Sequence, residues 1–353
     1  KAGSSKSSGL GSGASKRDQM CHMCQTPFTP DTEFDMVYTW MNMSVRSWQE
    51  YKHSHGGKVL TPEPYPWVYH ELLWSLRSLV KHKMWDRVRL IHIIYPDVGN
   101  HGIPVFLSED HPKIRLVGES KLSPDRPEPN REALRHMAAS IPDIADYFIL
   151  ADDDMMVQRP WNPDDYIKDG KYFVPLGPSD GEHKTSGFVK KVFNQWHGGQ
   201  FLHGPFIMSK CIHDAFKTLF PVEYQDTINQ GDVAQTIFAK SFNGNAALHC
   251  NLATKANNNA WAQEIHTNGM PNAERRIRAV GNEGGTGSVW VNIQGNGISD
   301  EYIDNRPLKL VYMEVMQNTF PEPFPGELPG YYEWFIKTWQ KGFVENPEQL
   351  KRM

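Results

Sequence analysis

Three consecutive aspartates, Asp152, Asp153 and Asp154, follow the apolar segment 147–151. An apolar run of this length predicts a buried strand, and the strand ends by crowding three like charges into one small volume. Such a cluster needs a counter-cation, and carboxylate oxygens are hard ligands that suit Mg²⁺ or Mn²⁺. We therefore predict that Asp153 and Asp154, helped by Asp152, hold a divalent cation for a phosphate-bearing substrate. The alternative is a solvated acidic turn, but open α/β sheets bind their ligands at the ends of such strands.

The segments around the aspartates alternate between strands and helices. Strands are predicted at 34–40, 87–95, 113–117 and 147–151, and helices at 69–82 and 130–140. This alternation predicts a mainly parallel sheet with right-handed crossovers. Because ligands gather at the carboxyl ends of parallel strands, the turn at 39–44 should lie beside the three aspartates. In the helix at 130–140, we expect Arg131, Glu132 and Arg135 to point outward.

The second half of the chain is less regular. Residues 176–200 are rich in Gly, Ser, Lys and His, a composition typical of a mobile loop that closes over a substrate. Helices are predicted at 212–219, 232–240, 306–318 and 331–339, and residues 243–287 are predicted to be loop with short elements. Residues 289–294 alternate like a strand and deliver Asn292 and Gln294 to one face, unless the segment is an ordinary hairpin.

Composition excludes several classes of protein. The chain has 353 residues, enough for a sizeable core, and its net charge of -4 gives no sign of a nucleic-acid partner. Aromatic residues make up 12% of the chain, which suits sugar binding as well as ordinary core packing. No apolar run reaches the length of about 18 residues that spans a membrane, so we expect membrane attachment only through a segment missing from this chain.

The four cysteines leave the redox compartment open. Cys21 and Cys24 are close enough in sequence for a tight disulfide or for half of a zinc site, but Cys211 and Cys250 are too far apart to complete a four-cysteine zinc module. A Cys211–Cys250 bridge in an oxidising lumen is the favoured interpretation. Residues 1–19 have almost no apolar content and are expected to be a flexible stem or linker. The lack of an initiating Met and of a signal peptide suggests the excised part of something longer.

Four blocks of the sequence resemble, in order, the conserved blocks of the Stealth family of sugar-phosphotransferases. Residues 34–42 (FDMVYTWMN) are similar to "DVVYTWVNG", and 71–79 (ELLWSLRSL) to "ELRYSLRSI". The strand and aspartates at 148–155 (FILADDDM) are similar to "FIYLNDDV", followed by 161–166 (WNPDDY), similar to "VWPDDFY". Shorter matches follow at 203–205, 220–221, 232, 291–294, 320–323 and 327–329. The resemblance covers roughly residues 34–330.

The sequence departs from the family pattern at several positions, so it resembles a divergent member. Leu73 stands at the place of a helical Arg, and residues 229–231 stand where an Arg should precede Asp232. The Glu of the family's middle helix is replaced by Arg135, and its His-Arg pair by Ala139 and Ser140. These departures leave open a different sugar nucleotide and a different reaction.

The resemblance implies an α/β fold with a mainly parallel twisted sheet flanked by helices, similar to Rossmann-like and GT-A-like nucleotide-sugar folds. It implies a single catalytic domain at 20–340. The nucleotide-sugar core would lie at 34–175, and an irregular half at 176–340 would bind the acceptor and complete the site. A tail would follow at 341–353.

The implied activity is transfer of a sugar-1-phosphate from a nucleotide-diphosphate sugar, of the UDP-GlcNAc or GDP-mannose type, to a hydroxyl of a glycan or glycoprotein acceptor. Such transfer needs a divalent cation, a positive group near phosphorus and a base for the acceptor proton. The resemblance assigns Arg77 as the positive group and His203 as the base, with Asp232 orienting the base, joining the metal, or simply capping a helix. The candidate substrate-binding residues are Tyr38, Thr39, Trp40, Asn42, Asn130, Asn292, Gln294 and Asn296.

Two other functions compete with this one. A metal-dependent glycosyltransferase would carry a similar acidic motif but release a nucleoside diphosphate, because its acceptor attacks the sugar carbon. A non-catalytic carbohydrate-binding relative would explain the missing family residues. The intact Asp153 and Asp154 and the four ordered blocks favour the phosphotransferase. Residence in the lumen of the secretory pathway, in the Golgi of a eukaryote, follows only from the resemblance and from the single sequon at Asn42.

Overall fold

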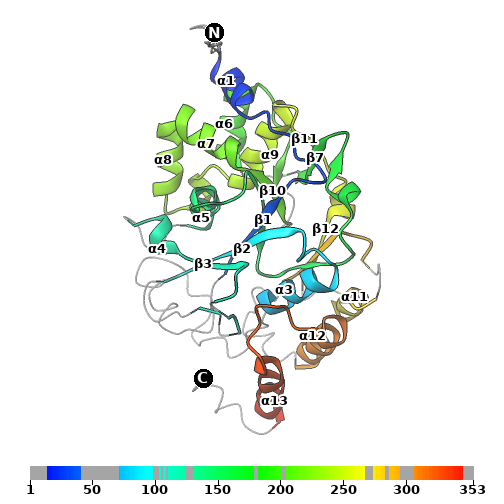
Figure 1. Ribbon diagram of the computed structural model, residues 1–353. Coiled ribbons are helices and arrows are strands. Elements are labelled where there is room, and N and C mark those ends of the chain that lie inside the picture. The colour runs from blue at the N-terminus through cyan, green and yellow to red at the C-terminus, as the bar shows by residue number, and fades with distance from the viewer. Residues whose placement is uncertain are drawn as a thin grey trace, which may run out of the picture.

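The computed structural model describes residues 14–40, 71–97, 103–104, 106–108, 110–124, 130–178, 182–200, 204–266, 273–282, 286–294 and 306–344. The helices between residues 183 and 249 lie toward the N-terminal helix α1 (Lys16–Met23), and those between residues 273 and 344 lie at the opposite end of the molecule (Figure 1). None of the described helices is both long and apolar enough to cross a membrane.

A five-stranded sheet forms the centre of the fold, with the strand order β10-β4-β1-β2-β3. The strands are β1 (Phe34–Thr39), β2 (Val88–Tyr95), β3 (Ile114–Gly118), β4 (Tyr147–Asp152) and β10 (Phe206–Ser209). The first four are parallel, and β10 is antiparallel to β4. This confirms the predicted mainly parallel α/β fold, with one strand from the second half at its edge. β4 is buried along its whole length, as its apolar sequence predicts.

The register of β1 and β4 brings the predicted turns together. Thr39 pairs with Asp152, so both strands end at the same edge of the sheet. The helix α3 (Glu71–Lys81) follows β1 in the described chain and confirms the prediction for 69–82 over the residues that the structure describes. Helix α5 (Arg131–Met137), extended by the 3₁₀ turn η1 (Ala138–Ser140), confirms the prediction for 130–140. The expected outward positions of Glu132 and Arg135 are wrong, because both side chains are fully buried.

Three small sheets lie beside the central one. They have the strand orders β12-β13-β5, β11-β7-β6 and β8-β9. Their strands are β5 (Met155–Val157), β6 (Ile167–Lys168), β7 (Lys171–Val174), β8 (Leu176–Gly177), β9 (Gly199–Gln200), β11 (Ala253–Lys255), β12 (Ala262–His266) and β13 (Trp290–Gln294). The predicted strand at 289–294 is therefore confirmed as β13. It lies inside a sheet, between β12 and β5, and is not part of a simple hairpin.

The remaining helices include α6 (His183–Phe193), which lies in a segment predicted to be a mobile loop. They are α4 (Glu119–Leu122), α6 (His183–Phe193), α7 (Lys210–Leu219), α8 (Pro221–Asn229), α9 (Ala239–His249), α10 (Asn258–Trp261), α11 (Ala273–Val280), α12 (Arg306–Thr319) and α13 (Tyr331–Val344), with 3₁₀ turns η2 (Pro163–Asp165) and η3 (Val233–Gln235). The mobile loop predicted at 176–200 is wrong over 183–193, where α6 buries Thr185, Phe188, Val189 and Phe193. The helix predicted at 232–240 is instead η3 followed by the start of α9.

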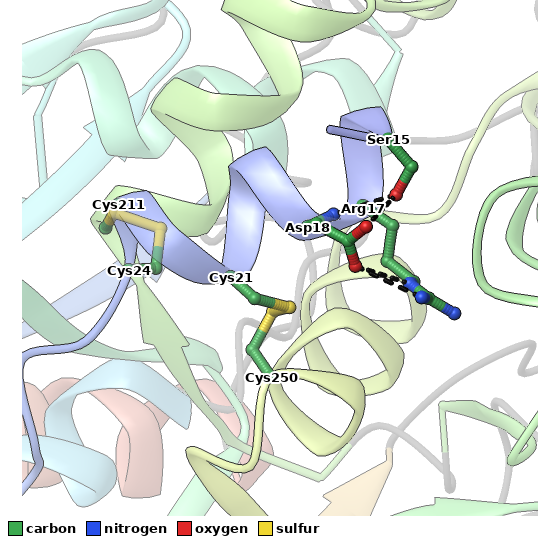
Figure 2. Close-up of a disulfide and its surroundings, with 7 residues drawn as sticks. All are labelled: Ser15, Arg17, Asp18, Cys21, Cys24, Cys211 and Cys250. Atoms are coloured by element: carbon green, nitrogen blue, oxygen red, sulfur yellow. Dashed lines mark hydrogen bonds and ion pairs between the residues drawn. A yellow bond between two sulfur atoms is a disulfide. The ribbon is translucent and has the colours of Figure 1, made fainter. Parts of the chain in front are cut away.

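Two disulfides attach helix α1 (Lys16–Met23) to the rest of the molecule. Cys21 bonds to Cys250, which caps α9, and Cys24 bonds to Cys211 on α7 (Figure 2). The favoured Cys211–Cys250 bridge is wrong, and so is the tight Cys21–Cys24 pair, because each cysteine of the N-terminal pair has a distant partner. Residues 16–19, expected to belong to a flexible stem, form the first part of α1.

The disulfides make up for the weak intrinsic stability of α1. An isolated helix of 8 residues is marginal in water. Ser15 caps its N-terminus by accepting a hydrogen bond from the Asp18 amide (Figure 2). Met20 is the one residue of the helix that is fully buried. Most of the helix surface faces solvent, so little apolar burial holds it in place. The attachment of α1 therefore depends on covalent bonds.

Removing the Cys21–Cys250 bridge by a Cys21→Ser, Cys250→Ser double substitution is expected to lower the free energy of unfolding by about 2–5 kcal/mol. The bridge joins residues 229 positions apart, so its loss releases much conformational freedom in the unfolded chain. Urea unfolding followed by tryptophan fluorescence measures the effect. Met23→Ser, at a side chain 47% exposed on the same helix, is the matched control and should change the free energy by less than about 0.5 kcal/mol. Equal urea midpoints for the double variant and the Met23→Ser control would contradict the prediction.

Candidate active site

The acidic turn lies between two strands that belong to different sheets. Asp152 is the last residue of β4, and β5 begins at Met155, so Asp153 and Asp154 form the connection. Because β5 pairs with β13, with Met155 opposite Asn292, the turn lies beside a strand from the second half of the chain. The buried Asn292 donates a hydrogen bond of 2.7 Å from Nδ2 to Asp154 Oδ1. The predicted site residues Asp154 and Asn292 are thus in direct contact.

Asp152 takes part in a buried ionic cluster behind the turn. Its Oδ1 accepts a hydrogen bond of 2.5 Å from Arg135 Nη2, and its Oδ2 lies 3.8 Å from Lys240 Nζ. Arg135 Nη1 also donates to Glu132 Oε1 at 2.5 Å. Burial alone would raise the pKa of Glu132, but the positive charges of Arg135, Arg131 and Lys240 lower it on balance. The positive charges around Glu132 therefore favour its ionised form.

This cluster changes the role expected for Asp152. A carboxylate that is already bound to a buried guanidinium and lies near a buried ammonium has little capacity left for a metal ion. Asp152 therefore anchors the end of β4 against α5 and α9, and the prediction that it helps to hold the cation is not supported. The burial of Glu132, Arg135 and Lys240 was missed from the sequence, because a helical pattern of polar residues normally predicts an exposed face.

Asp153, Asp154 and Glu71 form a second, purely acidic group. Burial and the charge of Asp152 raise the pKa of Asp154 to about 7, although the hydrogen bond from Asn292 opposes the rise. Burial and the charge of Asp154 raise the pKa of Glu71 to about 8. Burial, followed by the charge of Glu71, raises the pKa of Asp153 above its ordinary value. Glu71 was not among the predicted site residues, although it opens the second block that resembles the Stealth pattern.

The acidic group fits a cation that is shared with a phosphate. In the ranges that the structure describes, no group of three or more His, Cys, Asp or Glu side chains is arranged to hold a metal ion. Mg²⁺ does not need such a group, because one or two carboxylates commonly hold it while substrate phosphates complete its coordination. The mutual repulsion of Asp153, Asp154 and Glu71 is the type of unbalanced negative charge that a cation would relieve. Asp153 and Asp154 are the residues that would hold it.

The predicted substrate-binding residues of β1 are mostly buried. Tyr38 is fully buried, and its hydroxyl accepts a hydrogen bond of 3.0 Å from Ser75 Oγ. Burial, with a contribution from the charge of Asp153, raises the pKa of Tyr38 above its ordinary value. Trp40 is only 8% exposed and packs in the core. Thr39 is partly exposed at the sheet edge beside Asp152 and remains the best placed of the three for contact with a substrate.

Arg77 has a structural position. Its guanidinium forms a buried ion pair with Glu327, with Nη2 2.6 Å from Oε1 and Nε 2.9 Å from Oε2. It also donates to the carbonyl of Phe320 and lies over the ring of Tyr332, 3.9 Å from its centroid. All of these groups tie α3 to the C-terminal part of the chain. Because the guanidinium is fully engaged, the expectation that Arg77 stabilises charge on phosphorus is not supported.

Of the remaining predicted site residues, three are described by the structure and three are not. Asn130 caps α5 by accepting from the Ala133 amide, and Asp232 caps η3 by accepting from the Ala234 amide at 2.9 Å. The capping interpretation of Asp232 is thus confirmed, and its carboxylate lies at the surface. Gln294 ends β13. His203, Asn42 and Asn296 lie outside the described residues.

Comparison with known proteins identifies the region that carries the acidic turn. Residues 68–174 match the family model described as "Stealth protein CR2, conserved region 2". Over these residues the chain is similar to Stealth conserved region 2. This segment runs from the start of α3 to the end of β7 and contains Glu71, Asp153 and Asp154. The resemblance to the Stealth family is therefore confirmed for the part of the chain that builds the acidic side of the site.

Curated relatives match over a similar length of the chain. An exopolysaccharide phosphotransferase of Streptomyces coelicolor is 27% identical over 152 residues, 41% of this chain and 25% of that protein. A capsular polysaccharide phosphotransferase of Neisseria meningitidis serogroup B is 29% identical over 154 residues, 39% of each chain. One of Haemophilus influenzae is 27% identical over 152 residues, 40% of this chain and 38% of that protein. The match thus spans well under half the length of these relatives.

Among solved structures, the galactosyltransferase LgtC in complex with donor and acceptor sugar analogues aligns with a TM-score of 0.40 at 12% identity. The alignment covers 82% of this chain and 98% of that one.

Proposed function

We propose that the protein transfers a sugar-1-phosphate from a nucleotide-diphosphate sugar to a hydroxyl of a glycan. The acceptor oxygen forms a bond to the phosphorus that carries the sugar, and the bond from that phosphorus to the nucleoside monophosphate breaks. A base takes the acceptor proton. The products are a phosphodiester and a nucleoside monophosphate, and the donor would be of the UDP-GlcNAc or GDP-mannose type.

The acidic pair within the Stealth region is the observation that carries this proposal. Asp153 and Asp154 lie at the carboxyl edge of a parallel sheet, where α/β folds bind nucleotides, and within residues 68–174. The relatives that match over this region are named as phosphotransferases of bacterial polysaccharides. A carboxylate pair that requires a cation suits a donor whose pyrophosphate requires the same cation.

The described residues have distinct tasks in this proposal. Asp153 and Asp154 hold Mg²⁺ or Mn²⁺, which when bound supplies positive charge to the pyrophosphate and to the leaving nucleotide. Asn292 fixes the Asp154 carboxylate through its 2.7 Å hydrogen bond. The cluster of Arg135, Glu132 and Lys240 around Asp152 holds the end of β4 in place. His203 remains our proposed base, on the strength of the family pattern at 203–205.

The nucleotide released during transfer tests the proposal. The protein would be incubated with Mg²⁺ or Mn²⁺, a panel of UDP- and GDP-sugars and a mixed glycan acceptor, and the nucleotide products separated by chromatography. Acceptor-dependent nucleoside monophosphate is the expected product. Acceptor-dependent nucleoside diphosphate would overturn the proposal in favour of a glycosyltransferase. Donor binding without turnover would favour a carbohydrate-binding relative.

We also propose that the chain folds and works in an oxidising compartment, such as the secretory-pathway lumen of a eukaryote. Both pairs of cysteines are joined in disulfides, and such bonds persist outside the reducing cytosol. The partners in that compartment would be the nucleotide-sugar donor and a glycan or glycoprotein acceptor. Free-thiol labelling of the protein isolated from its native source tests this, since four reactive cysteines in the unfolded, unreduced protein would contradict it.

A further inference from the structure

Helix α5 presents two arginines to the acidic turn, one turn of helix apart. Arg135 is fully buried and donates to Asp152 at 2.5 Å. Arg131 precedes it by four residues, so the two side chains lie on the same face of the helix. Arg131 is exposed, in contrast to the six residues that follow it in α5. The face that carries Arg135 into the protein therefore carries Arg131 to the surface above the same turn.

The surroundings of Arg131 are charged but supply no direct partner. The like charge of Arg135 is the main influence that lowers the pKa of Arg131, while Asp152, Glu132 and Asp154 oppose it. The carboxylates of Asp152 and Glu132 are already hydrogen-bonded to Arg135. Within the part of the chain that the structure describes, Arg131 makes no hydrogen bond and no ion pair of its own. Its five N–H donors are thus available to a ligand at this edge of the sheet.

We propose that Arg131 binds a non-bridging oxygen of the donor pyrophosphate, beside the cation held by Asp153 and Asp154. This inference rests on the proposed function and assigns the positive group that Arg77 does not supply. A guanidinium matches the geometry of phosphate oxygens and remains charged at every physiological pH. Arg135 cannot take this task, since it is enclosed between Glu132 and Asp152.

The balance of charge at the turn favours this placement. Asp153, Asp154 and Glu71 present three carboxyl groups, and a pyrophosphate diester adds two further negative charges. One divalent cation shared between them leaves negative charge on the phosphate oxygens. A cationic side chain near the turn would meet that charge, and in the described structure Arg131 is an exposed arginine whose charge interacts with that of Asp154.

Isothermal titration of an Arg131→Gln protein with UDP, GDP and inorganic pyrophosphate, each with Mg²⁺, tests the inference. We expect diphosphate affinity to fall by about ten- to a hundred-fold, the usual effect of losing a charge-assisted hydrogen bond. Arg131→Lys should recover part of the loss, because it restores the charge without the planar fork. Arg278→Gln, at an exposed arginine of α11, is the control and should bind as the wild type does.

The outcomes separate this inference from the proposed function. Diphosphate binding by Arg131→Gln equal to that of the wild type would overturn the inference, whatever reaction the protein catalyses. A wild-type protein that binds none of the three probes would overturn it as well. If the wild type binds diphosphates through Arg131 but releases no nucleoside monophosphate in the transfer assay, the inference stands and the proposed reaction is wrong.

Discussion

Replacing Asp154 with asparagine is expected to reduce the rate of sugar-phosphate transfer by about a hundred- to a thousand-fold, without loss of folding stability. The substitution removes one of the two carboxylates that would hold the cation. It keeps the shape of the side chain and an oxygen that accepts the 2.7 Å hydrogen bond from Asn292. Because the pKa of Asp154 is raised by burial and by Asp152, a neutral side chain there also relieves repulsion within the turn.

Initial rates of nucleoside monophosphate release, measured over a range of Mg²⁺ concentrations, would show the effect. Urea unfolding of the same protein would confirm that the fold is intact. Asp164→Asn is the matched control, since Asp164 is an exposed acid of the η2 turn and takes no part in the proposed site. A wild-type rate for Asp154→Asn at saturating Mg²⁺ would remove the acidic pair from the proposal.

Arg135→Met is expected to destabilise the protein by about 3–5 kcal/mol. The methionine fills most of the volume of the arginine stem, but it leaves the fully buried Glu132 without its hydrogen-bonded cation. Asp152 also loses its 2.5 Å hydrogen bond from Arg135, and Lys240 remains 3.8 Å from it. The cost is thus the burial of uncompensated negative charge, and the free energy of unfolding in urea measures it.

A surface arginine and a double substitution make this test specific. Arg278→Met removes an exposed pair with Glu274 and should change the free energy of unfolding by less than about 0.5 kcal/mol. Adding Glu132→Gln to Arg135→Met removes one of the stranded charges and should recover part of the loss. If Arg135→Met unfolds at the wild-type urea concentration, the buried cluster does not stabilise the end of β4 as described.

The strands and the acidic turn were predictable from the sequence because they depend on local patterns. The apolar run before Asp152 could only be a buried strand in an alternating α/β chain, and the structure places β4 between β1 and β10. The alternation at 289–294 likewise predicted a strand with Asn292 and Gln294 on one face, and in the structure Asn292 of β13 contacts Asp154. Strand ends in a parallel sheet share one edge, so the topology alone brings these residues together.

Two of the errors have a different cause, because they depend on contacts between distant segments. The polar residues Glu132 and Arg135 look exposed on a helical pattern, and only Asp152 and Lys240 from other elements explain their burial. The pairing of four cysteines has three solutions that sequence spacing cannot separate. In α6, by contrast, the residues that form the buried face, Thr185, Phe188 and Val189, follow a helical spacing that was visible in the sequence. The Gly- and Ser-rich composition around them was given too much weight.

The two bridges of α1 also determine what proteolytic processing would do to this protein. A cut at any peptide bond between Cys24 and Cys211 gives two fragments that both bridges still join, and a cut between Cys211 and Cys250 leaves them joined through Cys21. The fragment carrying Asp154 and the fragment carrying Asn292 would therefore stay in one covalent unit after such a cut. A nicked protein would migrate as a single species without reductant and separate into two polypeptides with it.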